Sequence, residues 1–365
     1  MTPRVGIRAV AEAAGVSVTT VSHALNGKGR LPDATRRRVQ EVARELGYRP
    51  NATAQALAGG RSRLLGLAVS QAEDEPFALS DFAYFATLMS AATSAALEHG
   101  YALVLVHDDD RGEQIWSQVN VDGAVIVDPI PGNRLLEAVR ERELPLVTTG
   151  RIPGDEDGYW VDNDHVAGMR SMLDHLARQG AERVALMTTP PKTSYTADAL
   201  HAYESWCADT GVEPRIAWLD GGLTEGSGYE AATSLLRGDD PPDAIYSSLD
   251  RPALGALLAA HALGIAVPDE LLVAGCTDSN AGRAAEPALT ALGLQPERIG
   301  QLAVELLVDL VEGREPARHH LHVPTRVIAR GSTRRRQRAA VSPPAAAGAA
   351  ARRSRPGRRR TPSRP

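Results

Sequence analysis

The sequence predicts an all-α head at the N-terminus, followed by a two-lobed α/β body built on doubly wound parallel sheets. Within the first 50 residues, apolar side chains recur with the period of an α-helix. From Leu64 onward, short apolar runs alternate with amphipathic helical stretches in two successive series. The final stretch, 334–365, is rich in Arg, Ala, Pro and Ser and has no apolar period, so it predicts a disordered tail.

Three short helices account for the head, residues 1–50. Gly15 is a stop signal for the first, and Ser17 and Asp33 are suitable caps for the second and third. Gly47 ends the third. Each helix has one apolar face, formed by Ile7, Val10, Ala11 and Ala14 in the first, by Val21, Ala24 and Leu25 in the second, and by Val39, Val42, Ala43 and Leu46 in the third.

Residues 51–60 predict a short hinge helix between head and body. Pro50 disfavours helix at the residue before it, Asn51 can cap a helix through Ala58, and Gly59-Gly60 ends it. This segment has too few turns and too little apolar surface to be stable alone. We expect it to form only when it packs on something else.

The body, 64–333, should contain two parallel sheets covered by helices on both faces. Ligands of such sheets bind beyond the carboxyl ends of the strands, and in two facing lobes those ends would share one cleft. The expected strands are Leu64–Val69, Tyr101–Val106, Gly123–Val127, Leu146–Thr149, Val184–Met187, Arg215–Leu219, Ala244–Ser247 and Leu271–Ala274, with helices near 83–99, 112–119, 132–142, 164–179, 197–210, 226–237 and 252–263.

Charge is distributed unevenly along the chain. Residues 1–63 hold 11 basic and 4 acidic residues, whereas 64–333 hold 18 basic and 41 acidic residues. A basic head on an acidic body predicts that only the head meets a polyanion. The tail has 11 arginines and no acid, so it either adds salt-sensitive affinity for nucleic acid or only solubilises the chain.

Several protein classes are disfavoured by what the sequence lacks. There is no signal peptide, no run of 18 apolar residues and no motif around Cys207 or Cys276, so we expect a cytoplasmic protein without a membrane partner. No nucleophile elbow, P-loop or zinc-protease motif occurs, so we expect no catalytic residue and no cofactor. The cluster His319-His320-x-His322 is interpreted as a solvated strand rather than a metal site, since only His320 and His322 share a side.

The run from Gly15 to Gly27, GVSVTTVSHALNG, closely resembles the LacI/GalR family of bacterial repressors. Leu46–Asn51, Val161–Asp164, Pro287–Thr290 and Arg330–Thr333 continue the match over most of residues 5–333. The resemblance implies a helix-turn-helix head with its second helix in the major groove and a hinge helix in the minor groove. It also implies a periplasmic-binding-protein-like body that dimerises. We therefore expect a homodimeric transcriptional regulator, usually a repressor, on a near-palindromic operator of double-stranded DNA.

The second helix should carry the DNA contacts. Val18 and Thr19 suit thymine methyl groups, and His23 suits a base edge, with a phosphate contact as its alternative. In the family, a leucine at Leu57 wedges between base pairs of the minor groove; ordinary helix packing is the alternative. Phosphate-positioning or capping roles fall to Ser17, Thr20, Ser22, Asn26 and Asn51.

A small-molecule effector, a sugar or another metabolite, should bind between the lobes. Tyr84 and Phe85 resemble the aromatic pair of the purine repressor, and Asp128 follows an expected strand. The other candidates are Tyr195, Asp250, Thr277 and Asp278. Where the family usually has polar ligand contacts, this chain has Ala199, Leu249 and Thr277. Two alternatives therefore stay open: a constitutive DNA-binding regulator with a degenerate pocket, and an enzyme on a two-lobed scaffold.

Overall fold

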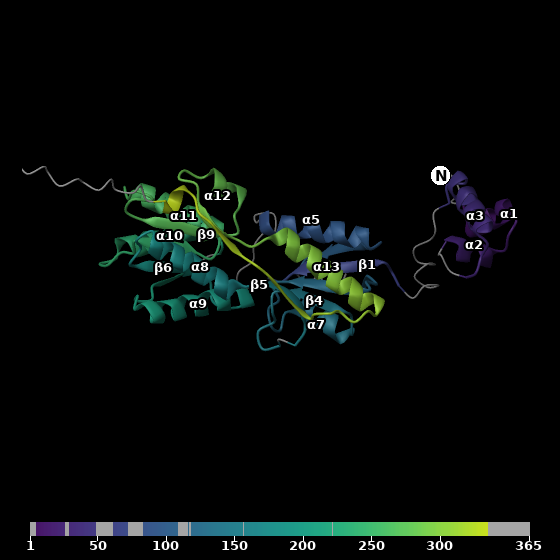
Figure 1. The fold of residues 1–365 in the computed structure, drawn as a ribbon, viewed down its shortest axis with the longest axis horizontal. Helices are drawn as coiled ribbons and strands as arrows, with labels where there is room; N and C mark the ends of the chain where they lie inside the picture. The colour runs from purple at the N-terminus through teal and green to yellow at the C-terminus, as the bar shows by residue number, and fades with distance from the viewer. Residues whose placement is uncertain are drawn as a thin grey trace, which may run out of the picture.

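The computed structural model describes residues 5–25, 29–48, 61–71, 83–108, 116, 118–155, 157–220 and 222–334. Within them lie three N-terminal helices followed by two α/β lobes (Figure 1). The expected hinge helix, with Asn51 and Leu57, lies outside the described residues. So do Asn26 and the tail beyond residue 334.

The head consists of α1 (Ile7–Ala14), α2 (Val18–Leu25) and α3 (Asp33–Glu45). Val10, Val21 and Val39 meet in its core and are fully buried. Gly15 ends α1 in the left-handed conformation, with φ of 62°. Asp33 does not cap α3 as expected: it is the first helical residue, and Pro32 occupies the cap position without a side-chain hydrogen bond.

Lobe 1 is a fully parallel sheet with strand order β11-β5-β4-β3-β1-β2. Its helices include α5 (Ala83–Glu98), α7 (Arg134–Glu141) and α13 (Pro296–Glu312). The strands are β1 (Leu64–Val69), β2 (Ala102–Val106), β3 (Gly123–Val127), β4 (Leu146–Thr149), β5 (Tyr159–Asn163) and β11 (His320–Val323).

Lobe 2 has the strand order β12-β10-β9-β8-β6-β7, and only β12 runs antiparallel to its neighbour. Its strands are β6 (Val184–Thr188), β7 (Ile216–Trp218), β8 (Ala244–Ser247), β9 (Leu272–Cys276), β10 (Thr290–Gly293) and β12 (Arg326–Ile328). Its helices are α8 (His165–Arg178), α9 (Ser194–Thr210), α10 (Glu225–Arg237), α11 (Asp250–Ala262), α12 (Asn280–Ala284) and the 3₁₀ turn η2 (Gly331–Thr333).

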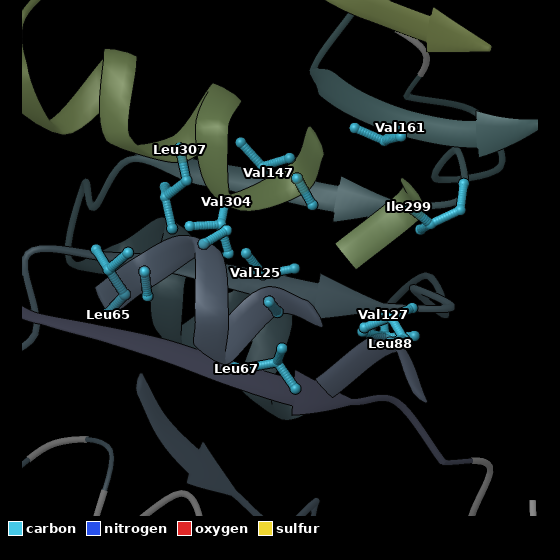
Figure 2. Close-up of a cluster of buried hydrophobic side chains, with 14 of the residues drawn as sticks. Leu65, Leu67, Leu88, Val125, Val127, Val147, Val161, Ile299, Val304 and Leu307 are labelled. Carbon is cyan, nitrogen blue, oxygen red and sulfur yellow. The ribbon is translucent and has the colours of Figure 1, made fainter. Parts of the chain in front are cut away.

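Each sheet is buried on both faces, as the unbroken apolar strands predict. In lobe 1, α5 and α13 cover one face with Leu88, Ile299, Val304 and Leu307 against strand residues such as Leu67 (Figure 2). Trp116 packs into the opposite face of the same sheet. Two further clusters fill the two faces of lobe 2.

The chain passes between the lobes three times: from β5 to α8, from β10 to α13 and from β11 to β12. Asn163, at the end of β5, joins the three crossings. Its buried amide nitrogen donates to the carbonyl oxygens of Leu294 and Val323, at 3.0 Å each. A buried amide satisfied by both other crossings fixes how the lobes meet.

Helices α10 and α11 of lobe 2 touch through glycines. A Cβ at Gly228 would lie 2.2 Å from the carbonyl oxygen of Pro252, and one at Gly255 would lie 2.1 Å from that of Glu225. These are backbone atoms, so no side chain can move aside to make room.

We expect Gly228→Ala to lower the free energy of unfolding by at least about 2 kcal/mol, because overpacking against backbone forces the helices apart. The control is Gly226→Ala in the same helix, where the nearest atom, Thr224 Oγ1, lies at 3.6 Å. That change should stabilise by about 0.5–1 kcal/mol, since alanine favours helix. Urea titration of both variants measures the difference; equal stability would contradict the packing argument.

Candidate DNA-binding face and effector cavity

Helix α2 turns its polar residues outward from the head. Val18 is 41% exposed, and Thr19 and His23 are also exposed, while Val21 and Ala24 are buried. Ser22 is half-buried. An exposed row at the N-terminal part of a second helix is the surface that reads base edges in helix-turn-helix proteins.

Ser17 and Thr20 are engaged with each other at the start of α2. The Ser17 hydroxyl accepts from the Thr20 amide at 3.0 Å and lies 2.8 Å from the Thr20 hydroxyl. Ser17 therefore caps the helix. These contacts support the capping role of Ser17 and Thr20. Their contact with phosphate stays a prediction.

His23 is held by two residues that the sequence reading did not single out. Arg36 of α3 donates to the carbonyl oxygens of His23, Ala24 and Gly29 at 3.4–3.5 Å. The His23 ring lies against Gly29, where a Cβ would come within 2.7 Å of Nδ1. Gly29 has φ of 72°, so both its conformation and the space favour glycine.

A cavity of about 50 Å³ lies between the two lobes of the body. Of the predicted effector residues, five line it: Tyr84, Phe85, Asp128, Tyr195 and Thr277. They follow strands or begin helices of both lobes, as expected at the carboxyl ends of parallel strands. The other lining residues are Thr149, Gly150, Val161, Asp162, His165, Leu249, Leu294 and Ile299.

The remaining two predicted effector residues do not line the cavity, and both have partners within the protein. The Asp250 carboxylate accepts from the Ser279 amide at 2.5 Å. Asp278 forms ion pairs with Arg283 at 2.8 Å and Arg330 at 2.6 Å. Both thereby hold the loop after β9, in which Thr277 and Asp278 have φ of 106° and 63°. Such φ values are uncommon outside glycine and mark a constrained loop.

Asp162 and His165 are the main polar groups that the sequence reading missed. The His165 Nε2 lies 2.9 Å from Asp162 Oδ1, and both residues are buried. Burial raises the pKa of Asp162, but the hydrogen bond from His165 and the charges of His165 and Arg151 outweigh it and hold that pKa below its ordinary value. In the sequence, Val161–Asp164 indicates only the family. No local pattern distinguishes the side chains of Asp162 and His165.

Arg151, which follows β4 in lobe 1, ties the lobes together beside this pair. Its guanidinium binds Asp198 of α9 in lobe 2 and lies 3.5 Å from Asp162 Oδ2. Its amide donates to the Ser194 hydroxyl at 3.1 Å. This arginine is therefore committed to structural partners.

Asp128 stands apart from these pairs. It follows β3 with φ of 49°, and within the described part of the chain its carboxylate makes no hydrogen bond or ion pair. Burial and the charge of Asp162 raise its pKa to about 7, although His165 acts in the opposite direction. A carboxyl held in this way accommodates a proton or a ligand at neutral pH.

Aromatic rings form much of the cavity wall. Tyr84 meets Phe85 edge to face at 5.4 Å and packs against the cores of both lobes. Tyr195 lies 4.7 Å from the His165 ring and donates its hydroxyl proton to the Ser248 carbonyl oxygen. Where the family usually has polar contacts, Ala199 is buried within α9 and Leu249 adds an apolar wall.

The histidines of β11 take the arrangement that strand alternation predicts. His320 and His322 both contact the Trp160 ring, at 4.7 and 5.0 Å, whereas His319 contacts Tyr159. All three are exposed. In the described ranges no group of three or more His, Cys, Asp or Glu could hold a metal, and no helix is long and apolar enough to cross a membrane.

We expect Asp128→Asn to stabilise the protein at pH 8 by on the order of 2–4 kcal/mol and to have little effect below pH 4. The folded state retains a proton on Asp128 up to a pKa of about 7, so the wild type loses stability as pH rises from about 4 to 7. Urea unfolding of both proteins between pH 4 and 8 measures the difference. Glu141→Gln, an exposed acid of α7, is the control and should show no such trend.

Known proteins resemble this chain in both parts. Residues 6–51 match the bacterial regulatory proteins of the lacI family, and residues 173–333 match a periplasmic binding protein-like domain. The transcriptional regulator PtxS of Pseudomonas aeruginosa is 31% identical over 90% of this chain and 96% of its own length. The repressor PurR of Edwardsiella ictaluri is 27% identical over 89% and 96%, respectively. These relatives are named as transcriptional regulators, not as enzymes.

Solved structures agree with the fold. The lac repressor dimer bound to operator and the anti-inducer ONPF is 23% identical, with a TM-score of 0.77 over 91% of this chain and 99% of that one. The regulator CelR in complex with cellobiose is 27% identical, with a TM-score of 0.66 over 90% and 100%. The family and the fold class predicted from the sequence are thus confirmed. The chain belongs to the LacI family of bacterial regulatory proteins and is a DNA-binding transcriptional regulator.

Proposed function

We propose that the protein is a homodimeric repressor whose affinity for a near-palindromic operator is controlled by a small molecule between the lobes. The head, 1–50, reads the operator, the hinge helix, 51–60, enters the minor groove, and the body, 64–333, senses the effector and dimerises. The observation that carries the effector role is the interlobe cavity, where Asp128 has no partner within the described residues. No catalysis is involved, and the protein acts on the nucleoid in the cytoplasm.

For DNA, the exposed row on α2 supports base contacts by Val18, Thr19 and His23. Arg36 holds the backbone carbonyl of His23, and Gly29 leaves room for the His23 ring. The positioning contacts to phosphate are assigned to Ser17, Thr20, Ser22, Asn26 and Asn51, and the minor-groove wedge to Leu57.

For the effector, the contacts are assigned to the predicted residues that line the cavity, together with Thr149, Asp162 and His165. Asp250 and Asp278 become positioning residues, because they hold the loop that carries Thr277. CelR, a relative of this fold, is solved with cellobiose, and a sugar or another metabolite fits the same role in this chain.

An effector controls DNA binding only if it binds two arrangements of the lobes unequally. The Arg151–Asp198 ion pair spans the lobes beside the cavity, so a ligand that alters the cavity also alters this link. The cavity of about 50 Å³ is well below the roughly 300–1,000 Å³ of typical ligand sites, so a whole metabolite requires the lobes or side chains to move.

A second candidate is a constitutive regulator whose pocket has degenerated. The apolar Leu249, the buried Ala199 and the small cavity favour it. Genome-wide mapping of bound sites, followed by operator binding with metabolites of the neighbouring pathway, separates the two. Loss of operator binding with one metabolite supports the sensor; operator binding that no such metabolite alters supports the constitutive regulator.

We expect Leu57→Ala to leave the melting temperature unchanged but to weaken operator binding at least tenfold, because alanine cannot unstack the central bases. Leu57→Met is the matched control, since methionine can also act as an apolar wedge and should keep most of the affinity. A gel-shift titration on a mapped operator gives both dissociation constants. An unchanged constant for Leu57→Ala would refute the wedge.

Homodimer formation is supported by exposed apolar side chains on both lobes. In lobe 1, Leu97 of α5 is 63% exposed and Leu105 of the edge strand β2 is 52% exposed. In lobe 2, Trp218, Tyr229 and Leu258 lie exposed on the edge strand β7 and on α10 and α11. We assign the contact with the second chain to these exposed side chains.

We expect Leu105→Lys to shift the protein from dimer to monomer, since a lysine on an edge strand opposes strand-to-strand association and would bury an unpaired charge. Sedimentation velocity at micromolar concentration measures the mass. Glu141→Lys places the same side chain on α7, and this control should stay dimeric. A Leu105→Lys protein that sediments as the wild type would argue against this surface.

A further inference from the structure

Asp128, Thr149 and His165 line the interlobe cavity, and each has a hydrogen-bonding side chain. The Asp128 carboxylate has no partner within the described residues. Thr149 and His165 are 3% and 6% exposed, and Thr149 Oγ1 and His165 Nδ1 are buried without a hydrogen-bond partner. Buried polar atoms nearly always have partners, so unpaired atoms beside a cavity indicate a ligand that supplies them.

The hydrogen bond between His165 and Asp162 fixes what His165 offers. Asp162 has a lowered pKa and is ionised at neutral pH, so its carboxylate accepts, and His165 Nε2 donates across the 2.9 Å contact. When the ring is neutral, Nδ1 carries a lone pair and is an acceptor, like the Asp128 carboxylate.

The cavity carries acidic charge without a free cation. Asp128 and Asp162 both line it, and no lysine or arginine of the described chain does. The nearest arginine, Arg151, is bound to Asp162 and Asp198. An anionic ligand would meet two carboxylates in a poorly solvated space, which costs several kcal/mol for like charges.

Aromatic faces surround the same space. Tyr84, Phe85 and Tyr195 contribute rings from α5 and α9. Ring faces attract cations, most strongly where water is excluded. The acceptors, the acidic charge and the rings therefore all favour a cationic group that donates hydrogen bonds.

We propose that the effector carries a protonated amine, held by the carboxylate of Asp128, the Nδ1 of His165 and the hydroxyl of Thr149 against the ring of Tyr84. The inference rests on the proposed effector function and names the chemical class of the ligand. An ammonium group has three donors and no acceptor, which matches three acceptors; a hydroxyl supplies one donor only. In this arrangement Thr149 Oγ1 and His165 Nδ1 are buried, so the ammonium group reaches them only when the lobes or side chains move.

The proposal predicts a proton linkage. Binding of the amine requires ionised Asp128, so affinity should fall about tenfold between pH 8 and pH 6, as expected for a pKa of about 7. The other groups facing Asp128 are Asp162, His165, Tyr84 and Tyr195, with Arg151 behind Asp162. The pKa of Asp162 is lowered, so Asp162 stays ionised over this range.

Thermal unfolding of the full chain against matched metabolites tests the proposal. Each set holds an amine that is protonated throughout this pH range, an alcohol and an acid on one skeleton: ethanolamine, ethylene glycol and glycolate; putrescine, 1,4-butanediol and succinate; and further sets built the same way. We expect the stabilising compounds to be amines, with dissociation constants about tenfold weaker at pH 6 than at pH 8. Stabilisation by the alcohols or acids, or by none of the amines, would overturn the proposal.

The variant Asp128→Asn tests whether the amine binds at Asp128. Asparagine tolerates the left-handed conformation of this position, so the variant should fold, and it should lose the amine response at least tenfold. Glu141→Gln removes an acid elsewhere in lobe 1 and should keep the response. An amine response that persists in Asp128→Asn would also overturn the proposal. Operator binding by the ligand-free protein is measured separately. A ligand-free protein that binds no operator contradicts the proposed function, while a missing amine response contradicts only this inference.

Discussion

The side-chain amide of Asn163 is the contact on which the geometry of the body depends. Two parallel sheets joined by three crossings could meet at many angles. The amide donates to Leu294 and Val323 and thereby joins all three crossings at one buried point. Such a bond is worth only about 1 kcal/mol net, but leaving its partners unsatisfied would cost more. It contributes more to the specificity of the arrangement than to stability.

The residues next to Asn163 in the chain have several different structural roles. Val161 lies in the core of lobe 1, Asp162 supports the cavity, and Asp164 caps α8 by accepting from the Ala167 amide at 2.9 Å. Along a strand, successive side chains point to opposite faces, so Val161 and Asp162 point to opposite faces of the sheet. The four consecutive residues thus link the core, the cavity, the crossings between the lobes and the first helix of lobe 2. A change in the cavity can therefore be transmitted to these crossings.

Most of the fold followed from the sequence because strand and helix periods are local. Four of the eight expected strands have the expected bounds, the other four are shifted by one or two residues, and the helices of the head match closely. The strands β5, β10 and β12 and the helix α13 were missed. In β5, Tyr-Trp-Val-Asp-Asn combines two rings with two polar residues and resembles no apolar run. Its burial depends on β4 and β11, and β11 lies about 160 residues away, which no local pattern reveals. The protein partners of Asp278 could not be predicted for the same reason, since Arg330 is distant in sequence.

Asp128 joins the stability of the body to its sensing role. An unpaired carboxyl at a buried, left-handed position destabilises the fold at neutral pH, and a stability optimum would replace it. A ligand that pairs with this carboxyl removes the penalty only in the arrangement of the lobes where the pair forms. The ligand therefore binds one arrangement of the lobes more tightly than the other. This difference in affinity shifts the equilibrium between the two arrangements. Since one pKa unit corresponds to about 1.4 kcal/mol, a shift of this size covers the 1–3 kcal/mol of coupling typical of allosteric proteins.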